Sequence, residues 1–493
     1  MMSGKMMFQP IILPPHHFTS FSDAESCQLF SRSDRMPPDL AALTSRRRVL
    51  AGAGMGLSSV ALSHLMAESR SHFPAKAKRV IWLFMHGGPS HVDLFDPKPE
   101  LIKHAGKPLP ESYGAVETRR KVAQNPLLGP VKAFRNHTQS GIEISEFLPR
   151  MAEIADEMCV IRSCHGDSVN HPQSVYQMNT GSILMGKPSL GSWVSYGLGS
   201  ENADMPAFVV MPDPGGGLKG GPPAWGAGFL PATYQGTTMR AGANPILHLQ
   251  SPQSSARQRA TLDLIQQMNT AHQAQRAADS VLEARVKAYE LAFRMQSAAP
   301  EAVDISRETE ATKRLYGIDE EKTREFGTRC LLARRMIERG VRFVQLYSGD
   351  TNGWDAHEDV LKNHTDYAAR TDKPVAGLIR DLKQRGLLED TLVIWGGEFG
   401  RMPMSEKGVG RDHNPWGYTT VLFGAGVKHG HIHGATDDFG LRATVDKVHI
   451  HDLHATILHL LGLDHDRLTF KHNGLDEKLT GVGESGVVKS ILA

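Results

Sequence analysis

Histidine and carboxylate side chains follow several apolar segments of this sequence, and the two types together are typical metal ligands. Because imidazole and carboxylate predominate and no CxxC pair occurs, the ligands suit zinc, manganese or iron rather than a cysteine-type structural zinc. One or two such ions would lower the pKa of a bound water to about 7 and hold the oxygens of a hydrolytic reaction. The residues that we expect to bind a divalent metal, Zn or Mn, are His86, Asp355, His357, Glu398 and His413.

Arg401 follows Glu398 by three positions, and two interpretations of its guanidinium stay open. The guanidinium group matches two oxygens of a phosphate or sulfate at once, so Arg401 can act as an oxyanion clamp. Alternatively, Arg401 simply pairs with Glu398. We expect the preceding Gly396 and Gly397 to let the backbone turn sharply after an apolar strand.

Three alternating histidines, His429, His431 and His433, form a second possible metal group. Their spacing places all three on one face of a strand. This pattern fits either a metal-binding triad or a half-exposed strand, and we expect the half-exposed strand. A histidine-rich metal carrier remains a minor alternative.

Apolar strand candidates alternate with helical segments along the chain. We expect strands at 79–85, up to Ser163, and at 207–211, 341–347, 392–395 and 419–424. This alternation predicts an α/β protein, with a three-layer α/β/α arrangement around a mostly parallel sheet. In open sheets of this kind, ligands bind beyond the carboxyl ends of the strands. The candidate metal ligands mostly follow those ends.

The sequence divides into a leader, one large domain and a tail. Residues 1–78 form the leader, residues 79–480 the α/β domain and residues 481–493 the C-terminal tail. Within the domain, the Gly- and Pro-rich stretch 212–245 predicts a long loop or lid. Residues 253–330 are expected to contain a helical insertion, which begins with an Ala- and Gln-rich stretch.

The stretch TSRRRVLAGAGMGLSS in the leader resembles a twin-arginine (Tat) export signal. Arg46 and Arg47 precede an apolar, glycine-rich segment. An N-terminal anchor helix is the alternative, but the glycines and serines disfavour it. We therefore expect export through the Tat machinery to the periplasm or the extracellular space, with no stable membrane span after cleavage. The candidate cleavage positions are Ala67 and Ala75, and the candidate start residues are Met1 and Met36.

Composition and missing motifs exclude several classes of protein. The formal net charge of +2 gives no indication of binding to nucleic acid or to an anionic membrane. The sequence has four cysteines, and three remain if Cys27 is lost with the leader, an odd count that argues against a disulfide framework. It has no P-loop, dinucleotide fingerprint, G-x-S-x-G elbow or HExxH motif. Nucleotide-binding proteins, serine hydrolases and zincins are therefore disfavoured.

Several blocks of the sequence look like the recurring motifs of a known family. They are MHGGPSHVDLFDPKPEL, NGWDAHED, WGGEFGRMP, GRDHNPWGY and DLHATILHLLGLDHDRLTFKHNGLDEKLT. The chain is thereby identified as a member of the bacterial family "domain of unknown function fifteen-oh-one", which is abundant in planctomycetes and often Tat-exported. More loosely, residues 79–480 resemble the alkaline phosphatase/sulfatase superfamily, because SEFLPRMAEIADEMCVIRS and YAARTDKPVAGLIRDLKQRGLLEDTLVIWGGE are similar to sulfatase segments.

The superfamily resemblance implies roles for single residues and also shows departures. His86 stands where the superfamily usually has a metal-binding Asp, and Glu398 stands where it has an Asp-His pair. His171 stands where sulfatases have the Cys or Ser that becomes formylglycine, so that motif is absent. Ser168 and Ser174 lie near enough to leave the nucleophile open. The positions that match the superfamily's metal ligands are Asp355, His357 and His413.

We therefore expect an exported metal-dependent hydrolase of phosphate or sulfate esters, with a small molecule or a polysaccharide as substrate. Its expected catalytic residues are His171, Ser174 and Arg401. The alternative is a binding or scaffold protein that kept the fold and lost the chemistry.

Overall fold

A nine-stranded sheet forms the centre of the protein. The computed structural model describes residues 71–240, 245–246, 253–274 and 280–493. The predicted export signal lies outside these residues. The strands in spatial order are β12 (His431–His433), β4 (Met158–His165), β11 (Tyr418–Phe423), β8 (Thr391–Gly396), β1 (Arg79–Met85), β7 (Phe343–Ser348), β5 (Phe208–Met211) and β6 (Thr237–Thr238), and β15 (Val448–His449) also pairs with β4.

The sheet is mostly parallel, as the sequence predicts. β1 runs parallel to β7 and β8, and β5 runs parallel to β6 and β7. Only β11 runs antiparallel to its neighbours, β4 and β8. Each predicted strand agrees with an observed strand to within two residues. The carboxyl ends of β1, β4, β5, β7 and β8 therefore meet at one edge of the sheet.

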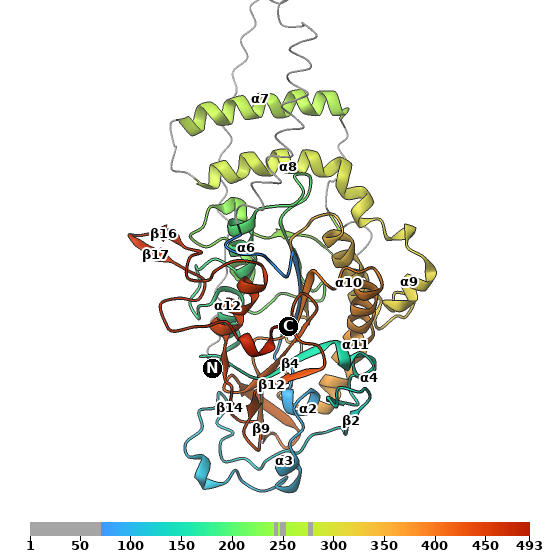
Figure 1. The fold of residues 1–493 in the computed structure, drawn as a ribbon, viewed down its shortest axis with the longest axis vertical. Helices are drawn as coiled ribbons and strands as arrows, with labels where there is room; N and C mark the ends of the chain where they lie inside the picture. The colour runs from blue at the N-terminus through green and yellow to red at the C-terminus, as the bar shows by residue number, and fades with distance from the viewer. Residues whose placement is uncertain (1–70, 241–244, 247–252, 275–279) are drawn as a thin grey trace, which may run out of the picture. The chain divides into compact units, whose positions relative to one another are not determined.

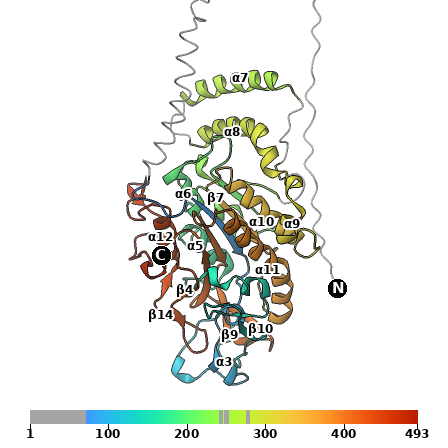
Figure 2. The same cartoon turned by 45° about the vertical axis from the view of Figure 1, so that its right-hand side comes forward.

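Helices cover both faces of the sheet. Alternate residues of β1 point to opposite faces, so Ile81 and Leu83 join one apolar core while Trp82 and Phe84 join the other. The first core contains α4 (Pro149–Ala152), α10 (Arg324–Ile337) and α11 (Val360–Gln384), and the second contains α5 (His171–Thr180), α6 (Leu190–Leu198) and α12 (Ile450–Leu460). Figure 2 shows α5 and α12 on one side of the strands and α10 and α11 on the other. The predicted α/β/α layering is confirmed.

A hairpin that the sequence did not indicate follows β8. It consists of β9 (Gly400–Glu406) and β10 (Gly410–Asn414), and its register places Arg401 opposite His413. The chain bends at Glu398, directly after Gly396 and Gly397, where the sequence predicts a sharp turn, although neither glycine has a positive φ. Gly397 instead permits a close approach, since a Cβ there would lie 2.5 Å from the carbonyl oxygen of Met85.

The remaining elements lie around this core (Figure 1). The helical insertion contains α7 (Ser255–Ala274), which packs on α8 (Ser280–Val303), and α8 in turn packs on α10. The other elements are α2 (His91–Leu94), α3 (Pro99–Lys103), α9 (Glu310–Leu315) and the hairpins β2 (Phe134–Asn136) with β3 (Glu143–Ser145), β13 (Ala435–Thr436) with β14 (Ala443–Val445), and β16 (Phe470–His472) with β17 (Leu475–Glu477).

The C-terminal residues pack against the domain. The backbone N–H of Lys428 donates to the carbonyl oxygen of Ile491 at 2.8 Å, and that of Ala493 donates to the carbonyl oxygen of Gly426 at 2.8 Å. Among the described residues, no helix has the length and apolarity needed to cross a bilayer.

Candidate metal centre

The loops at the carboxyl edge of the sheet bring most of the expected site residues together. His86 follows β1, Glu398 follows β8, and His171 is the first residue of α5, after β4. The loop between β7 and α11 provides Asp355 and His357, while β10 provides His413. The side chains of these six residues are buried or nearly so. Residues that are far apart in the sequence thus form one buried polar group.

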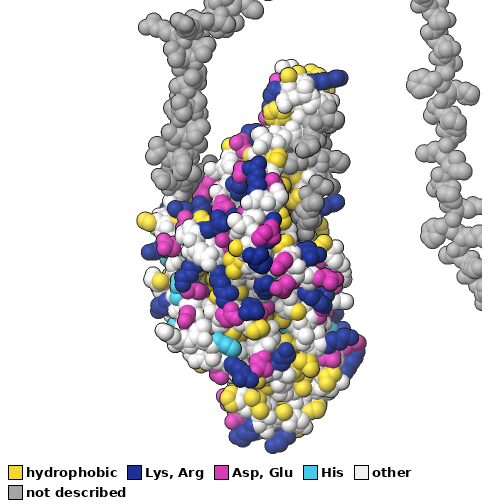
Figure 3. Space-filling model, turned by 90° about the vertical axis from the view of Figure 1, so that its right-hand side faces the viewer, with side chains coloured by type: hydrophobic (Ala, Val, Ile, Leu, Met, Phe, Trp, Pro, Cys, Tyr) yellow, Lys and Arg dark blue, Asp and Glu magenta, His cyan; other side chains and the backbone are white. Residues whose placement is uncertain are grey.

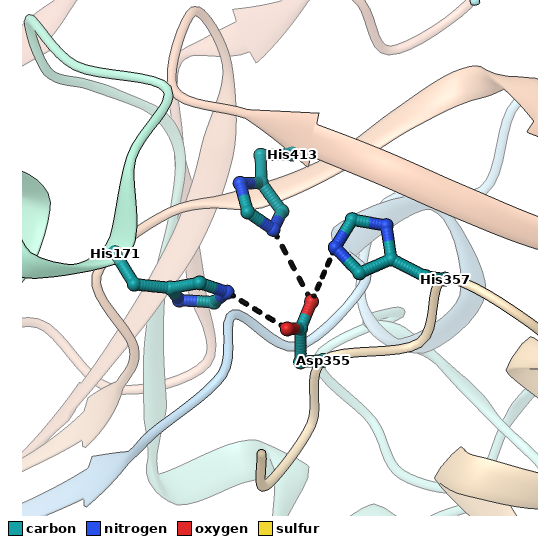
Figure 4. Close-up of side chains that lie close together, drawn as sticks. All are labelled: His171, Asp355, His357 and His413. Carbon is teal, nitrogen blue, oxygen red and sulfur yellow. Dashed lines mark hydrogen bonds and ion pairs between the residues drawn. The ribbon is translucent and has the colours of Figure 1, made fainter. Parts of the chain in front are cut away.

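Asp355 lies at the middle of this group (Figure 4). Its Oδ1 atom is 2.9 Å from Nε2 of His357 and 3.2 Å from Nε2 of His413. Its Oδ2 atom is 3.0 Å from Nε2 of His171. Three imidazoles therefore point the same ring nitrogen at one carboxylate. These four residues form a possible metal-binding group, because one ligand atom from each lies within 4.8 Å of the others.

The other nitrogen of each imidazole is held by an oxygen acceptor. Such contacts fix the orientation of a metal-binding histidine and leave the opposite nitrogen free to bind the metal. The acceptors of Nδ1 are Glu398 for His171 (2.6 Å), Glu406 for His357 (2.6 Å) and the backbone oxygen of Val169 for His413 (2.6 Å). In the neutral state each ring therefore carries its proton on Nδ1 and presents a lone pair at Nε2.

The protonation of His413 makes this arrangement informative. Burial, the largest cause, lowers the pKa of His413 well below its ordinary value, so the ring is neutral near pH 7. Its Nε2 lone pair then faces a carboxylate oxygen, and two acceptors at 3.2 Å repel each other unless a cation lies between them. The buried Nε2 atoms of His171 and His357 also have no hydrogen-bond partner. This donor set fits a divalent cation.

The charge of Asp355 is kept in place by its neighbours. Burial alone would raise the pKa of this carboxyl, but the Arg401 guanidinium and the three imidazoles outweigh burial and lower the pKa well below its usual range. Asp355 is therefore an anion throughout the physiological pH range and a suitable metal ligand.

Two smaller groups adjoin the centre and share a histidine with it. The first consists of His86, His171 and Glu398, and the second of His357, Glu406 and Asp412. In the first group, Nε2 of His86 lies 4.0 Å from Glu398 Oε1, and Nδ1 of His86 donates to the backbone oxygen of Asp350 at 3.1 Å. Carboxylates therefore flank the central group on two sides.

Glycine allows the loop after β1 to reach this position. Gly87 has a φ of +105°, and a Cβ there would lie 2.6 Å from the backbone nitrogen of Asp355. The N–H of Gly87 donates to both carboxylate oxygens of Glu398, at 2.9 and 3.2 Å. The carbonyl oxygen of His86 accepts from the backbone N–H of Trp354 at 2.9 Å. The loop thus joins the backbone of one metal-ligand segment to that of another.

Arg401 pairs with Asp355 and not with Glu398. Its side chain has no exposed surface, and one terminal nitrogen lies 2.8 Å from Asp355 Oδ1. The other nitrogens donate to the backbone oxygens of Gly88 and Arg411, at 2.9 and 3.2 Å. With its donors bound to the protein, Arg401 fixes the position of Asp355.

Two other predicted groups lie apart from the centre. The hydroxyl of Ser174 donates to the backbone oxygen of Ser168 at 2.7 Å, so it is engaged within the start of α5. His429 lies outside β12 and is about half exposed, and among the described residues His431 and His433 belong to no group with metal-binding spacing.

Sequence reasoning missed two residues of the site, Lys219 and Glu406. The ammonium of Lys219 lies 2.8 Å from Asp355 Oδ2, and 24% of this side chain is exposed. The sequence could have indicated Lys219, because it is the only lysine or arginine between Pro212 and Met239 in the Gly- and Pro-rich loop. No sequence pattern indicated Glu406, because its contact with His357 depends on the unpredicted hairpin of β9 and β10.

The fold and the site together define an α/β protein with a buried histidine–carboxylate centre at the carboxyl edge of its sheet. A family model described as "Protein of unknown function (DUF1501)" matches residues 77–492, so the chain belongs to this family. None of the curated proteins matches the sequence significantly.

Among solved structures, the fold is similar to those of sulfatases and phosphatases. The PsFucS1 sulfatase from Pseudoalteromonas sp. is 12% identical with a TM-score of 0.34, and the match covers 86% of this chain and 76% of the sulfatase. The alkaline phosphatase from the Antarctic bacterium TAB5 is 9% identical with a TM-score of 0.34, and the match covers 79% of this chain and 99% of the phosphatase.

Proposed function

We propose that the protein is an exported metal-dependent hydrolase of phosphate or sulfate esters. The observation that carries this proposal is the convergence of three imidazole Nε2 atoms on Asp355, with His413 held neutral by burial. Three buried lone pairs around one carboxylate fit a divalent cation, and imidazole with carboxylate suits Zn or Mn.

The chain's own residues suggest how the metal would be held. His171, Asp355, His357 and His413 would bind the ion, and Glu398 and Glu406 would orient two of the imidazoles. When bound, a divalent ion of this kind acidifies water and polarises the oxygens of an ester. His86 and Glu398 adjoin the group and could extend it to a second ion.

Lys219 is the cation best placed to contact the anionic part of a substrate. Arg401 is fully buried and its donors are bound to backbone oxygens, whereas Lys219 is partly exposed and has a flexible stem. We therefore assign the binding of phosphate or sulfate oxygens to Lys219, and we assign the positioning of Asp355 to Arg401. Charge-assisted contacts of this kind stabilise the negative charge that develops in ester hydrolysis.

Water is the proposed attacking group. His171 occupies the first position of α5, and the nearby Ser174 hydroxyl is engaged with Ser168. Hydrolysis would therefore proceed without formylglycine and without Ser174 as nucleophile. The water oxygen would form a bond to phosphorus or sulfur while the bond from that atom to the ester oxygen breaks, and the leaving alcohol would take up the proton that the water loses.

The proposal is tested by turnover on aryl phosphates and aryl sulfates with the full-length, metal-loaded protein. We expect turnover that the His413→Ala variant loses, together with its metal. Turnover that persists in His413→Ala, or none on any ester of the panel in protein that carries metal, would sink the proposal.

A second candidate function is a binding or scaffold protein without catalysis. It is favoured by the two cations, Arg401 and Lys219, that already contact the Asp355 carboxylate, because they neutralise its charge without a metal. This candidate predicts protein that takes up no metal and hydrolyses no ester, yet binds phosphate or sulfate.

Export through the Tat machinery is the proposed route to the periplasm or the extracellular space. It rests on Arg46 and Arg47 and the apolar segment that follows them. Replacing both arginines by lysine should leave the protein in the cytoplasm of a Tat-competent cell, as immunoblots of cell fractions would show. Unchanged export of this variant would count against the route.

A further inference from the structure

A cavity of about 340 Å³ lies between α9, α11 and the start of α4, and most of its wall is cationic. It shares no residue with the metal centre. Lys373, in its wall, follows the N-cap of α11, Asp359, by fourteen residues, which places it roughly 21 Å along that helix from the end near the centre. The residues that line the cavity are Arg150, Ala311, Arg314, Leu315, Lys373 and Arg380.

Close backbone packing forms one wall of the cavity. Lys373, Gly377 and Arg380 lie on one face of α11, because their spacing is four and three residues. A Cβ on Gly377 would lie 2.9 Å from the carbonyl carbon of Leu315, so only glycine lets the end of α9 approach α11 this closely. Arg314 and Leu315 are thereby held beside the two cations of α11.

A buried carboxylate fixes the second wall. Asp372 accepts hydrogen bonds from the backbone N–H groups of Arg150 and Met151, both at 2.8 Å. These bonds hold the first turn of α4 against α11 and place the side chain of Arg150 at the cavity. The walls are therefore set by the packing of three helices.

The cations at this cavity outnumber the carboxylates that neutralise them. Glu153 pairs with both Arg150 and Arg380, at 2.9 and 2.6 Å, and Glu320 pairs with Lys373 at 2.6 Å. Arg314 has no ion-pair partner within the part of the chain that the structure describes. Four cations against three carboxylates, with the buried Asp372 counted beside Glu153 and Glu320, leave a local charge of about +1. Figure 3 shows basic and acidic side chains interspersed over this side of the molecule, so the excess at the cavity is local.

We propose that this cavity binds a tetrahedral oxyanion, the phosphate or sulfate group of a small organic molecule. Guanidinium groups match the oxygens of such an anion in pairs, and Arg314 is free to do so. The volume falls in the range of small-molecule sites, roughly 300–1,000 Å³. Ala311 and Leu315 provide an apolar wall for the organic part. The site is independent of the metal centre and of ester hydrolysis.

Isothermal titration of the full-length protein with inorganic phosphate, inorganic sulfate, glucose 6-phosphate and glucose tests this proposal. We expect phosphate or sulfate to bind, glucose 6-phosphate to bind more tightly than the free anion, and glucose not to bind. Each of the variants Arg314→Gln and Lys373→Gln should weaken anion binding about tenfold or more, because each removes a charge-assisted contact. The matched control is Arg135→Gln, which removes an exposed cation paired with Glu146 on the β2–β3 hairpin.

Three results would overturn the proposal. They are the absence of anion binding, equal weakening in Arg135→Gln, and full binding in both cavity variants. The variant Asp355→Ala separates the cavity from the metal centre. We expect it to retain anion binding, and loss of binding there would assign the anion to the metal centre instead.

Discussion

Nε2 of His413 lies 3.2 Å from Oδ1 of Asp355, and both atoms are acceptors near pH 7. His413 donates through Nδ1 to the backbone oxygen of Val169, and burial keeps its ring neutral. A buried contact between a lone pair and an anionic oxygen costs free energy unless a cation satisfies both. This contact supports the proposal that a metal ion binds here.

The carboxylate behind His357 should control metal affinity without binding the metal itself. Glu406 lies 2.6 Å from Nδ1 of His357, and an amide at this position can no longer accept with a full negative charge. Glu406→Gln should weaken metal binding about 10- to 100-fold, measured by competition with a chelating dye. The control Glu358→Gln changes an exposed neighbour that pairs with Lys407. Equal affinities for the two variants would refute this role of Glu406.

Lys219 should affect the use of anionic substrates more than the binding of metal. Lys219→Met removes the partly exposed ammonium beside Asp355. We expect kcat/KM for an aryl phosphate or sulfate to fall about 10- to 100-fold, because a charge-assisted contact to the developing anion is lost. Lys219→Arg should lose less than Lys219→Met, because it keeps a cation, and the exposed control Lys407→Met should leave kcat/KM unchanged. Unchanged kcat/KM with retained metal in Lys219→Met would contradict the assignment.

The ion pair of Arg411 and Asp93 should matter for stability. Both side chains are fully buried at a distance of 2.7 Å, and Arg411 also donates to the backbone oxygens of Leu128 and Gly129. Asp93→Ala leaves a buried guanidinium without its counter-ion, so the free energy of unfolding should fall by about 3–5 kcal/mol in urea titrations. The exposed pair of Arg135 and Glu146 provides the comparison, and Glu146→Ala should cost less than about 1 kcal/mol. Equal losses would show that burial of the Asp93 pair has no special effect.

Acid should destabilise the protein partly through His454. Burial lowers the pKa of His454 to about 3, and its Nε2 donates to the backbone oxygen of Met178 at 2.7 Å. Between pH 6.5 and 3 the unfolded chain holds a proton that the folded state lacks. The free energy of unfolding therefore falls as the pH falls through this window, by at most about 5 kcal/mol from this residue.

Denaturant titrations at several pH values check this effect. His454→Gln keeps a donor for Met178 but cannot take up the proton, so its stability should depend less steeply on pH between 6.5 and 3. The control His429→Gln changes an exposed histidine and should keep the original slope. If His454→Gln has the slope of the parent protein, His454 does not contribute to acid unfolding.

The sequence predicted the sheet well, because buried parallel strands are continuous apolar runs. β1 and β8 are examples, since both are buried along nearly their whole length and were recognised to within a residue. Glycine and charged residues after these strands also indicated where the site lies. Seven predicted metal or catalytic residues, among them His86, Asp355 and Arg401, do lie together there.

The detailed pairing within the site depends on tertiary structure that no local pattern shows. Arg401 follows Glu398 by three residues, yet it pairs with Asp355, because the hairpin of β9 and β10 turns its side chain toward the β7–α11 loop. Lys219 reaches the centre from a loop whose next residue, Gly220, accepts a hydrogen bond from the Tyr176 hydroxyl of α5 at 2.8 Å. Neither contact involves neighbours in sequence.

Metal analysis of the full-length protein tests the central claim most directly. The protein is purified without chelator, incubated with Zn or Mn, freed of excess metal and measured by inductively coupled plasma mass spectrometry beside Asp355→Ala. We predict at least one metal ion per chain in the parent protein and less than a tenth of that in Asp355→Ala. Parent protein that retains no stoichiometric metal, or an Asp355→Ala variant that retains as much as the parent, would contradict the account.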